Sequence, residues 1–233
     1  MSNLKEIFGS TNKQSNNIWM STSDLMSGLM MVFMFIAISY MVVERKSYQT
    51  AEVFKKAKLE LVQALKKEFN KDLKGWRAEI NEAEISIRFV GPEILFDPGK
   101  SFIKPEFQII LNNFYPRYLG VLSDFKEFID EIRIEGHTSK GWKNKSNNAS
   151  YLLNMELSQD RSRSVLSHVL NLVRHKIPKE LLSWAKKRIT ANGLSSSKLI
   201  YKKDGKYDQK KSRRVEFKIR TNAEERLDLI LSK

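Results

Sequence analysis

The chain has 233 residues, of which 41% are hydrophobic and 29% are charged, and its formal net charge is +14. This length fits one ordinary domain with additional segments, or two very small domains. Cysteine is absent, which excludes disulfides, thiol catalysis and cysteine-type zinc sites. The histidines show no metal-ligand spacing, so no metal site is expected. The positive charge indicates an anionic partner or environment: nucleic acid, phospholipid headgroups or the carboxylates of a bacterial wall.

The first predicted element is an apolar helix over residues 18–43, which contains one formally charged group, Asp24. At about 1.5 Å per residue the helix is about 39 Å long, enough to cross a hydrocarbon core about 30 Å thick. Trp19 and Tyr40 lie near its two ends, where aromatic rings favour the membrane interfaces. A cleaved signal peptide would be shorter and would end in a small-residue cleavage site. We therefore expect an uncleaved membrane anchor, preceded by a short polar tail of residues 1–17.

Asp24 is the candidate functional residue of this helix. An ionised aspartate inside a membrane costs about 2.5–3.5 kcal/mol, so it persists where it faces protein or water. At helical spacing Asp24 shares a small, polar face with Ser21, Ser27 and Gly28, which suits the close approach of a partner helix. A carboxyl group in this setting can take up a proton on one side and release it on the other. The alternative is that Asp24 only caps the start of the helix at the membrane interface.

Residues 44–80 are predicted to form a helical linker, because Phe54, Ala57, Leu61 and Leu65 make an apolar stripe at helical spacing. Two interpretations stay open: the helix packs on the following domain, or it pairs with its copy in a dimer or plugs a channel. The positive-inside rule does not decide the orientation, because basic residues lie on both sides of the span. We expect the short N-terminus inside the cell and the long domain outside, mainly because of the character of that domain.

From Glu84 onward the hydrophobic pattern changes to the period of two that is typical of strands. Strands are expected at 84–91, 93–96, 130–139, 188–196 and 212–221. Helices are expected at 105–121, 155–175 and 178–187, with a loop rich in Gly, Ser and Asn before the second of them. The order β, β, α, β, α, α, β, β predicts an α+β fold, an α/β sandwich with helices on one face of a mixed sheet.

Four ordered blocks in residues 84–221 resemble those of the OmpA-like peptidoglycan-binding domain: ILFDPGKSFIKPEF, IRIEGHTS, NMELSQDRSRSV and KSRRVEFKIR. The resemblance implies that residues 81–221 form a domain that clasps the diaminopimelate part of the wall peptide. The residues implied at this site by motif position are Asn154, Leu157, Ser158 and Arg161, with His137 and Ser139 from the second block. Arg161 would pair with a peptide carboxylate, which a planar guanidinium suits well. Without the resemblance, Arg161 on a helix indicates only a surface salt bridge.

One departure from the family concerns Ser139, which stands where the family has an acidic residue. That acid meets the ammonium group of the ligand, and the loop from Ser139 to Asn154 is also longer than usual. The departure leaves the form of the ligand, or the affinity for it, open.

The short tail, the helix W-x-x-x-x-D-L-M-x-G-L-M-x-V-F and the OmpA-like domain together resemble the MotB class of stator subunits. The variant TSDLMSGLMMVFMFIAISY is most similar to the ZorB family of Zorya anti-phage defence. The resemblance implies a homodimer in the bacterial inner membrane, enclosed by a ring of a multi-span MotA-like or ZorA-like subunit, with the C-terminal domain in the periplasm. Asp24 would carry the transported ion, a proton or alternatively sodium. No cofactor is implied, and no substrate bond is broken, so the chain is not expected to be an enzyme.

Three alternatives remain beside this interpretation. The first is a flagellar-type stator subunit, and the second is a passive tether between membrane and peptidoglycan, which would need no ion carrier. The basic residues 197–220 would suit a nucleic-acid patch, but the stretch has few interleaved aromatic rings beyond Tyr201 and Tyr207. A solvated basic loop near anionic wall or lipid is the preferred interpretation, and no nucleic-acid partner is expected. Residues 222–233 are predicted to be a C-terminal tail.

Overall fold

The computed structural model describes the backbone of residues 4–142 and 144–222, and the side chains of residues 22–45, 52–142 and 144–222. The ends of both predicted tails, residues 1–3 and 223–233, lie outside the described residues. The chain divides into two compact units: Met1–Glu52 with Arg226–Lys233, and Val53–Glu225. Helix α1 (Leu4–Phe69) supplies the helical part of the first unit and the first helix of the second.

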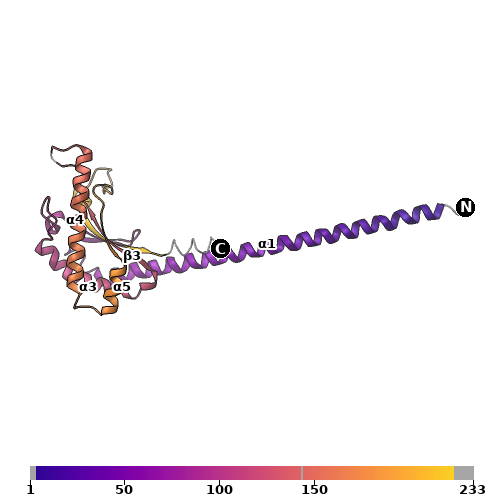
Figure 1. Ribbon diagram of the computed structural model, residues 1–233, viewed down its shortest axis with the longest axis horizontal. Coiled ribbons are helices and arrows are strands. Elements are labelled where there is room, and N and C mark those ends of the chain that lie inside the picture. Colours follow the sequence, from indigo (N-terminus) through magenta and orange to yellow (C-terminus); the bar gives the residue numbers. More distant parts are fainter. Residues whose placement is uncertain (1–3, 143, 223–233) are drawn as a thin grey trace. The chain divides into compact units, whose positions relative to one another are not determined.

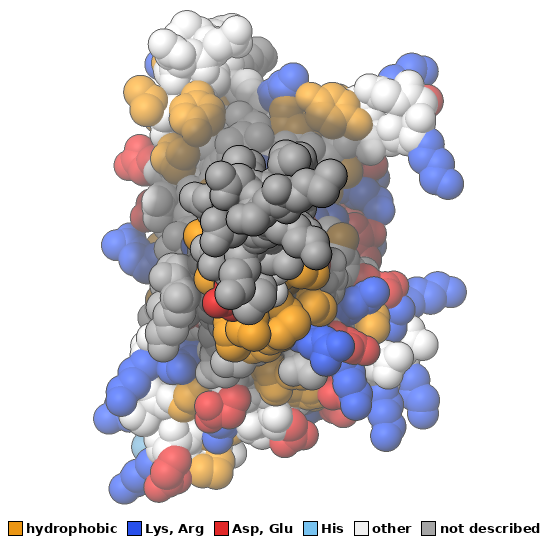
Figure 2. Space-filling view, turned by 90° about the vertical axis from the view of Figure 1, so that its right-hand side faces the viewer, with side chains coloured by type: hydrophobic (Ala, Val, Ile, Leu, Met, Phe, Trp, Pro, Cys, Tyr) orange, Lys and Arg blue, Asp and Glu red, His pale blue; other side chains and the backbone are white. Residues whose placement is uncertain are grey.

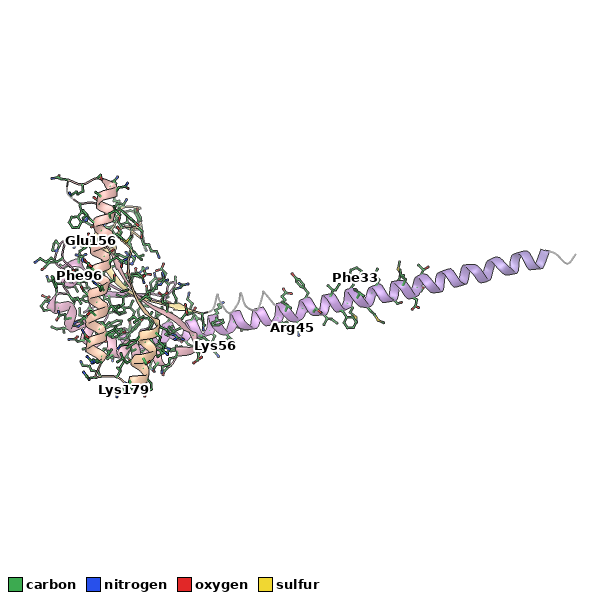
Figure 3. The ribbon with its side chains drawn as sticks, in the orientation of Figure 1. Phe33, Arg45, Lys56, Phe96, Glu156 and Lys179 are labelled. Carbon is green, nitrogen blue, oxygen red and sulfur yellow. The ribbon has the colours of Figure 1, made fainter. Side chains whose placement is uncertain are left out.

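The first unit contains an apolar helical segment without protein cover. Every residue from Thr22 to Arg45 is exposed, and this segment is long and apolar enough to cross a membrane. Phe33 is 61% exposed, and Figure 3 shows side chains pointing away from the helix all along this stretch. Large apolar side chains on all sides of a helix need lipid or partner helices around them.

The second unit is built on a five-stranded mixed sheet with the strand order β1-β2-β5-β3-β4. Its strands are β1 (Ala78–Asn81), β2 (Ser86–Val90), β3 (Ile129–His137), β4 (Ile189–Gly193) and β5 (Arg214–Thr221). All neighbours are antiparallel except β3 and β4, which are parallel. Helices α3 (Pro105–Ser123), α4 (Asn147–Val173) and α5 (Lys179–Arg188) lie on one face of the sheet (Figure 1). The predicted α+β fold is therefore confirmed.

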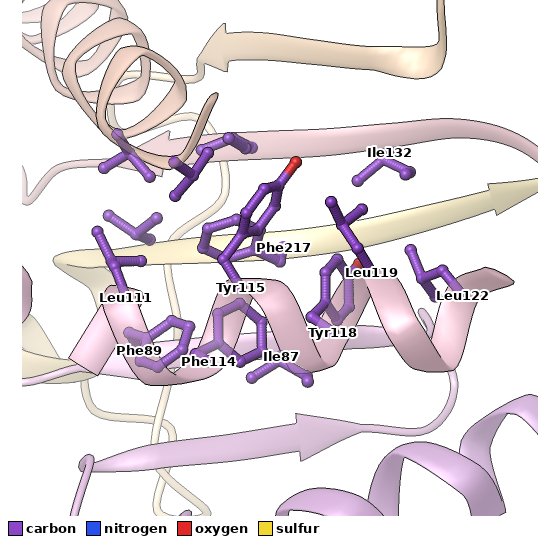
Figure 4. Close-up of a cluster of buried hydrophobic side chains, with 14 of the residues drawn as sticks. Ile87, Phe89, Leu111, Phe114, Tyr115, Tyr118, Leu119, Leu122, Ile132 and Phe217 are labelled. Carbon is purple, nitrogen blue, oxygen red and sulfur yellow. The ribbon is translucent and has the colours of Figure 1, made fainter. Parts of the chain in front are cut away.

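The hydrophobic core lies between α3 and the sheet (Figure 4). Strand alternation places Phe217 of β5 and Phe89 of β2 on the helix side, and both are fully buried. The ring of Phe114 on α3 lies 4.9 Å from that of Phe217 and 5.1 Å from that of Phe89. The remaining members that α3 contributes are Phe107, Ile110, Leu111, Tyr115, Tyr118, Leu119 and Leu122. This face of the sheet is closed by aromatic packing, so a ligand site has to lie elsewhere.

The last turns of α1 belong to the same core. Leu61, Leu65 and Phe69 are at most 1% exposed and pack within the main cluster of buried side chains. Arg117 of α3 fastens this end: its Nε donates to Glu68 at 2.6 Å, and its guanidinium lies 5.0 Å from the ring of Phe69. The apolar stripe of the predicted linker is thus covered by its own domain, and in this arrangement it is not available to plug a channel.

We expect Leu61→Ala to lower the free energy of unfolding of the second unit by about 2–5 kcal/mol, because it leaves a cavity in the core. Leu59→Ala is the matched control, since Leu59 lies on the same helix but is 54% exposed. It should change stability by less than about 0.5 kcal/mol. Thermal unfolding of the full chain in detergent compares the two. Equal stability of both variants would mean that α1 does not pack into the domain.

Three local elements differ from the sequence prediction. Residues 78–81 form the edge strand β1 rather than the end of a helix, and they pair with β2. Residues 92–95 form the short helix α2 (Pro92–Leu95) rather than a strand, because Pro92 starts a helical turn after Gly91, whose φ is 107°. Helix α4 begins at Asn147 rather than near residue 155, because the Ser146 side chain accepts a hydrogen bond from the Ala149 N–H and caps it.

Candidate functional site

Asp24 lies well inside α1, which begins at Leu4, so it does not cap the start of this helix. Asp24, Ser27 and Gly28 are all exposed. A Cβ atom added to Gly28 would meet nothing within 4 Å, so this part of the helix surface leaves room for a partner helix. Ser21 lies outside the residues whose side chains the structure describes.

A second candidate site depends on how closely α4 approaches the sheet. Gly136 of β3 and Gly193 of β4 are register partners that lie directly beneath this helix. A Cβ atom on Gly193 would lie 2.3 Å from the amide nitrogen of Gln159, and one on Gly136 would lie 2.6 Å from the carbonyl oxygen of Ser158. Both distances are too short for real atoms, so only glycine fits at these two positions. The contact fixes the depth at which α4 presents its polar residues.

The hydroxyl groups on the inner face of α4 complete this contact. Ser162 donates to the carbonyl oxygen of Asn192 in β4 at 2.9 Å, and the Ser158 hydroxyl accepts from the Ser195 N–H at 3.0 Å. Both serines are fully buried. Ser158, predicted to touch the ligand, is therefore engaged inside the fold and positions its helix.

Asn154 is similarly engaged. Its Nδ2 donates to the carbonyl oxygen of Ser139 at 3.0 Å, and its Oδ1 accepts from the indole N–H of Trp142 at 2.9 Å. These bonds close the loop between β3 and α4 over the start of the helix. Leu157 and Ser139 are half-buried, and neither they nor Asn154 and Ser158 line the cavity described next.

Arg161 points from α4 into a cavity of about 340 Å³ at the end of the sheet. Its Nε donates to the carbonyl oxygen of Lys100 at 2.9 Å and its Nη2 to that of Asp97 at 3.1 Å, while its guanidinium lies 4.8 Å from the ring of Phe96. Burial, with Arg213 nearby, lowers the pKa of Arg161 to about 10, so it stays charged at neutral pH. Among the described residues, these bonds leave three of its five N–H groups for a ligand.

The cavity carries both signs of charge. Lys104, Arg213 and Arg214 line it with Arg161, and Glu93 and Asp97 supply carboxylates. The Asp97 carboxylate lies 3.7 Å from both Lys100 and Lys104, which is a loose pairing. The uncharged lining residues are Pro92, Leu95, Phe96, Pro98, Gly136, His137 and Val215. A cavity with a positive excess and one loosely held acid suits a ligand that has carboxylates and an ammonium group.

His137 connects the cavity to a buried charged cluster on the sheet face away from the helices. Its Nε2 lies 3.4 Å from Glu135 and 3.7 Å from Glu216, and all three residues are at most 3% exposed. Burial lowers the pKa of His137 and outweighs the two acids, so the ring is neutral at pH 7. Burial would raise the pKa of Glu216, but Arg214, His137 and Arg88 lower it to about 2.

The three groups of this cluster are close enough to be considered as metal ligands, since their ligand atoms lie within 4.8 Å of one another. However, Arg214 and Arg88 both pair with Glu216 and Ser86 donates to it at 3.0 Å. The arginines already neutralise the carboxylate, so the cluster is a buried ion network that holds the ends of β3 and β5 beside the cavity.

Sequence reasoning missed Glu93, Asp97, Arg213 and Arg214. The sequence places Asp97 in the first family block, and both arginines in the last block and in the basic residues 197–220, without indicating a role at the wall site for any of them. The available signal was that all four belong to, or directly precede, the blocks that carry the family resemblance. Their convergence around Arg161 depends on tertiary structure.

Comparisons with known proteins identify relatives of this chain. The model of the OmpA family matches residues 95–213. A Zorya protein ZorB of Escherichia coli (strain Crooks) is 45% identical over 219 residues, covering 91% of each chain. Among solved structures, a MotB-like protein from Desulfovibrio vulgaris is 23% identical over 74% of this chain and 94% of its own, with a TM-score of 0.47. The periplasmic domain of Helicobacter pylori MotB is 15% identical over 63% and 83%, with a TM-score of 0.42. By the extent of the first two matches, the chain belongs to the OmpA family and is a homologue of the Zorya protein ZorB.

Proposed function

We propose that the chain is the wall-anchored stator subunit of a proton-driven inner-membrane motor that acts in Zorya anti-phage defence. One observation carries the proposal. This chain is a homologue of ZorB along nearly its whole length, and the apolar helical stretch before Glu44 contains a single charged residue, Asp24. An acid in such a helix is a functional group by default, because its cost has to be offset by a partner or by water.

The ion step needs two copies of the chain, each with one Asp24, inside a ring of a MotA-like multi-span subunit. Protons pass from outside to inside by binding to each Asp24 carboxylate and leaving it in turn. Each charge that crosses supplies about 2.3 kcal/mol per 100 mV of membrane potential. The N-terminus lies in the cytoplasm and the second unit in the periplasm, and torque on the ring is the signal to cytoplasmic effectors.

The second unit would hold the stator still by binding peptidoglycan in the Arg161 cavity. The free N–H groups of Arg161 take a carboxylate of the wall peptide in a forked geometry. The family has an acidic residue at the position of Ser139, and we assign its role to Asp97, which binds the ammonium group. The Asp97 carboxylate lines the same cavity and is only loosely paired. No bond is broken in this role.

Two alternatives share the wall site, namely a flagellar-type stator subunit and a passive tether. A tether needs neither an ion carrier nor a multi-span partner, so co-purification of such a partner distinguishes it from a stator. A flagellar role would appear as a motility defect, and a defence role as a loss of protection from phage.

We expect Arg161→Ala to weaken binding of the full chain to purified sacculi by about tenfold or more, because a charged hydrogen-bond donor to the ligand is lost. Arg163→Ala is the matched control: Arg163 lies two residues away on α4, and its side chain is 79% exposed and paired with Asp160. Arg161→Lys separates charge from geometry, because it keeps the charge but cannot make the fork. Co-sedimentation measures all three, and equal binding by the Arg161 and Arg163 variants would contradict the proposed wall site.

A further inference from the structure

A basic hairpin lies between β4 and β5 beside the cavity; the name covers residues 198–213, which end in the short helix α6 (Gln209–Ser212). Tyr201 and Tyr207 pair across it as an antiparallel bridge, and Lys202 and Lys206 are joined by a backbone hydrogen bond of 2.8 Å. Gly205 closes the turn with a φ of 77°. The hairpin therefore has a defined backbone.

The two ends of the hairpin are bonded to each other, and one of them is also bonded to β5. The Ile200 N–H donates to the Ser212 hydroxyl at 2.9 Å, and the Arg214 guanidinium donates to the carbonyl oxygen of Lys198 at 3.1 Å. Near the tip, the Tyr207 hydroxyl accepts from the Lys140 N–H at 3.2 Å. A backbone held in this way loses little backbone entropy when the hairpin binds a partner.

The charge of the hairpin exceeds what its own ion pairs use. Its basic residues are Lys198, Lys202, Lys203, Lys206, Lys210, Lys211 and Arg213, against the acids Asp204 and Asp208. Lys206 pairs with Asp204 at 3.8 Å and Lys211 with Glu79 at 2.7 Å. Four lysines have no ion pair with any described residue: Lys198, Lys202, Lys203 and Lys210. Clustered like charges of this kind favour an anionic partner.

This charge continues into the cavity. Arg213, the last residue of the hairpin, lines the cavity with Arg161. The pKa of Glu93 in the cavity wall is lowered, first by a backbone hydrogen bond and then by the charge of Arg77. Lys210 is close enough to add a smaller contribution in the same direction. The basic residues of the hairpin therefore adjoin the charged wall of the cavity, to which Arg213 and Glu93 both belong.

We propose that the basic hairpin is a second wall-binding site. One peptide of a wall polymer occupies the cavity, and the hairpin binds the carboxylates of neighbouring peptides on the same polymer. The inference rests on the proposed function, because it needs a wall peptide in the cavity. A wall polymer repeats its carboxylates, so a second contact on the same strand is intramolecular and raises the overall affinity without improving the first site. Nucleic acid is less suited, since the hairpin has only two aromatic rings, and one of them, Tyr207, is half-buried between Tyr201 and Lys140.

The test replaces Lys198, Lys202, Lys203 and Lys210 by Gln in the full chain. Binding to sacculi should fall by about tenfold at low ionic strength and by less at high ionic strength, where exposed charges are screened. Affinity for a single soluble wall peptide should stay unchanged, because that ligand occupies only the cavity. Basic side chains project from many places on the surface in Figure 2, so the control has to remove the same charge elsewhere. Replacing the exposed residues Lys176, Lys179, Lys186 and Lys187 by Gln does this and should leave sacculus binding unchanged.

Three results would overturn the inference. If both quadruple variants lose sacculus binding equally, the effect is one of general charge. If the hairpin variant also loses affinity for the soluble peptide, the hairpin is part of the cavity site. Unchanged sacculus binding with a selective loss of binding to DNA or to anionic vesicles would assign the hairpin to another partner. The proposed function is assessed separately by Arg161→Ala. If the unaltered chain binds no sacculi, the proposed function fails. If Arg161→Ala weakens sacculus binding but the quadruple hairpin variant does not, only the hairpin inference fails.

Discussion

An Asp24→Asn chain is expected to reach the membrane and assemble with its multi-span partner, yet to protect cells from phage no better than an empty vector. Asparagine has nearly the same size and shape as aspartate, so packing around residue 24 is kept. Its amide cannot take up and release a proton at physiological pH, so the ion step stops. The measurements are plaque formation for protection and co-purification of the ring subunit for assembly.

Two further variants separate the carboxylate from mere polarity in the helix. Asp24→Glu keeps the acid and should retain part of the activity, with the loss reflecting the displaced carboxylate. Ser39→Asn places an extra amide elsewhere in the same exposed stretch and should leave protection intact. Full protection by Asp24→Asn would remove the ion-carrying role, and the wall-binding half of the proposal would then describe a tether.

The strongly periodic parts of the chain could be predicted from sequence. The strand around Ile87 and Phe89, the helix that begins at Pro105 and the final strand with Val215, Phe217 and Ile219 all follow from alternation or from helix-start residues. Prediction failed where a local signal was weak: β1 has four half-buried residues and exists through its pairing with β2. A strand of that kind is specified by its neighbour rather than by its own pattern.

The candidate site was predictable only in part. Arg161 was identified by motif position, and it does point into a cavity. Asn154 and Ser158 occupy the same motif, but their side chains bond within the fold, to Ser139 and Ser195. A motif records which positions matter, and it does not distinguish a residue that touches a ligand from one that positions the helix bearing it. The acids and arginines that converge on the cavity come from segments far apart in sequence, so spacing could not bring them together.

Gly193→Ala should be the most disruptive single-methyl change in the second unit. The new Cβ atom would lie 2.3 Å from the amide nitrogen of Gln159 and 2.7 Å from its Cα, which are backbone atoms of α4 and cannot turn aside. The helix has to move outward, and we expect a loss of about 3 kcal/mol or more in the free energy of unfolding, at the upper end for overpacking. Thermal unfolding of the full chain in detergent measures this loss.

Gly120→Ala is the matched control, because Gly120 lies in α3 and an added Cβ would meet nothing within 4 Å. It should stabilise the domain by about 0.5–1 kcal/mol through higher helix propensity. The two variants also differ in function, since an outward shift of α4 withdraws Arg161 from the carbonyl oxygens of Asp97 and Lys100 that orient it. Gly193→Ala should therefore lose sacculus binding even at temperatures where it remains folded, while Gly120→Ala keeps it. If the folded Gly193 variant binds sacculi normally, the depth of α4 against the sheet does not set the geometry of the cavity.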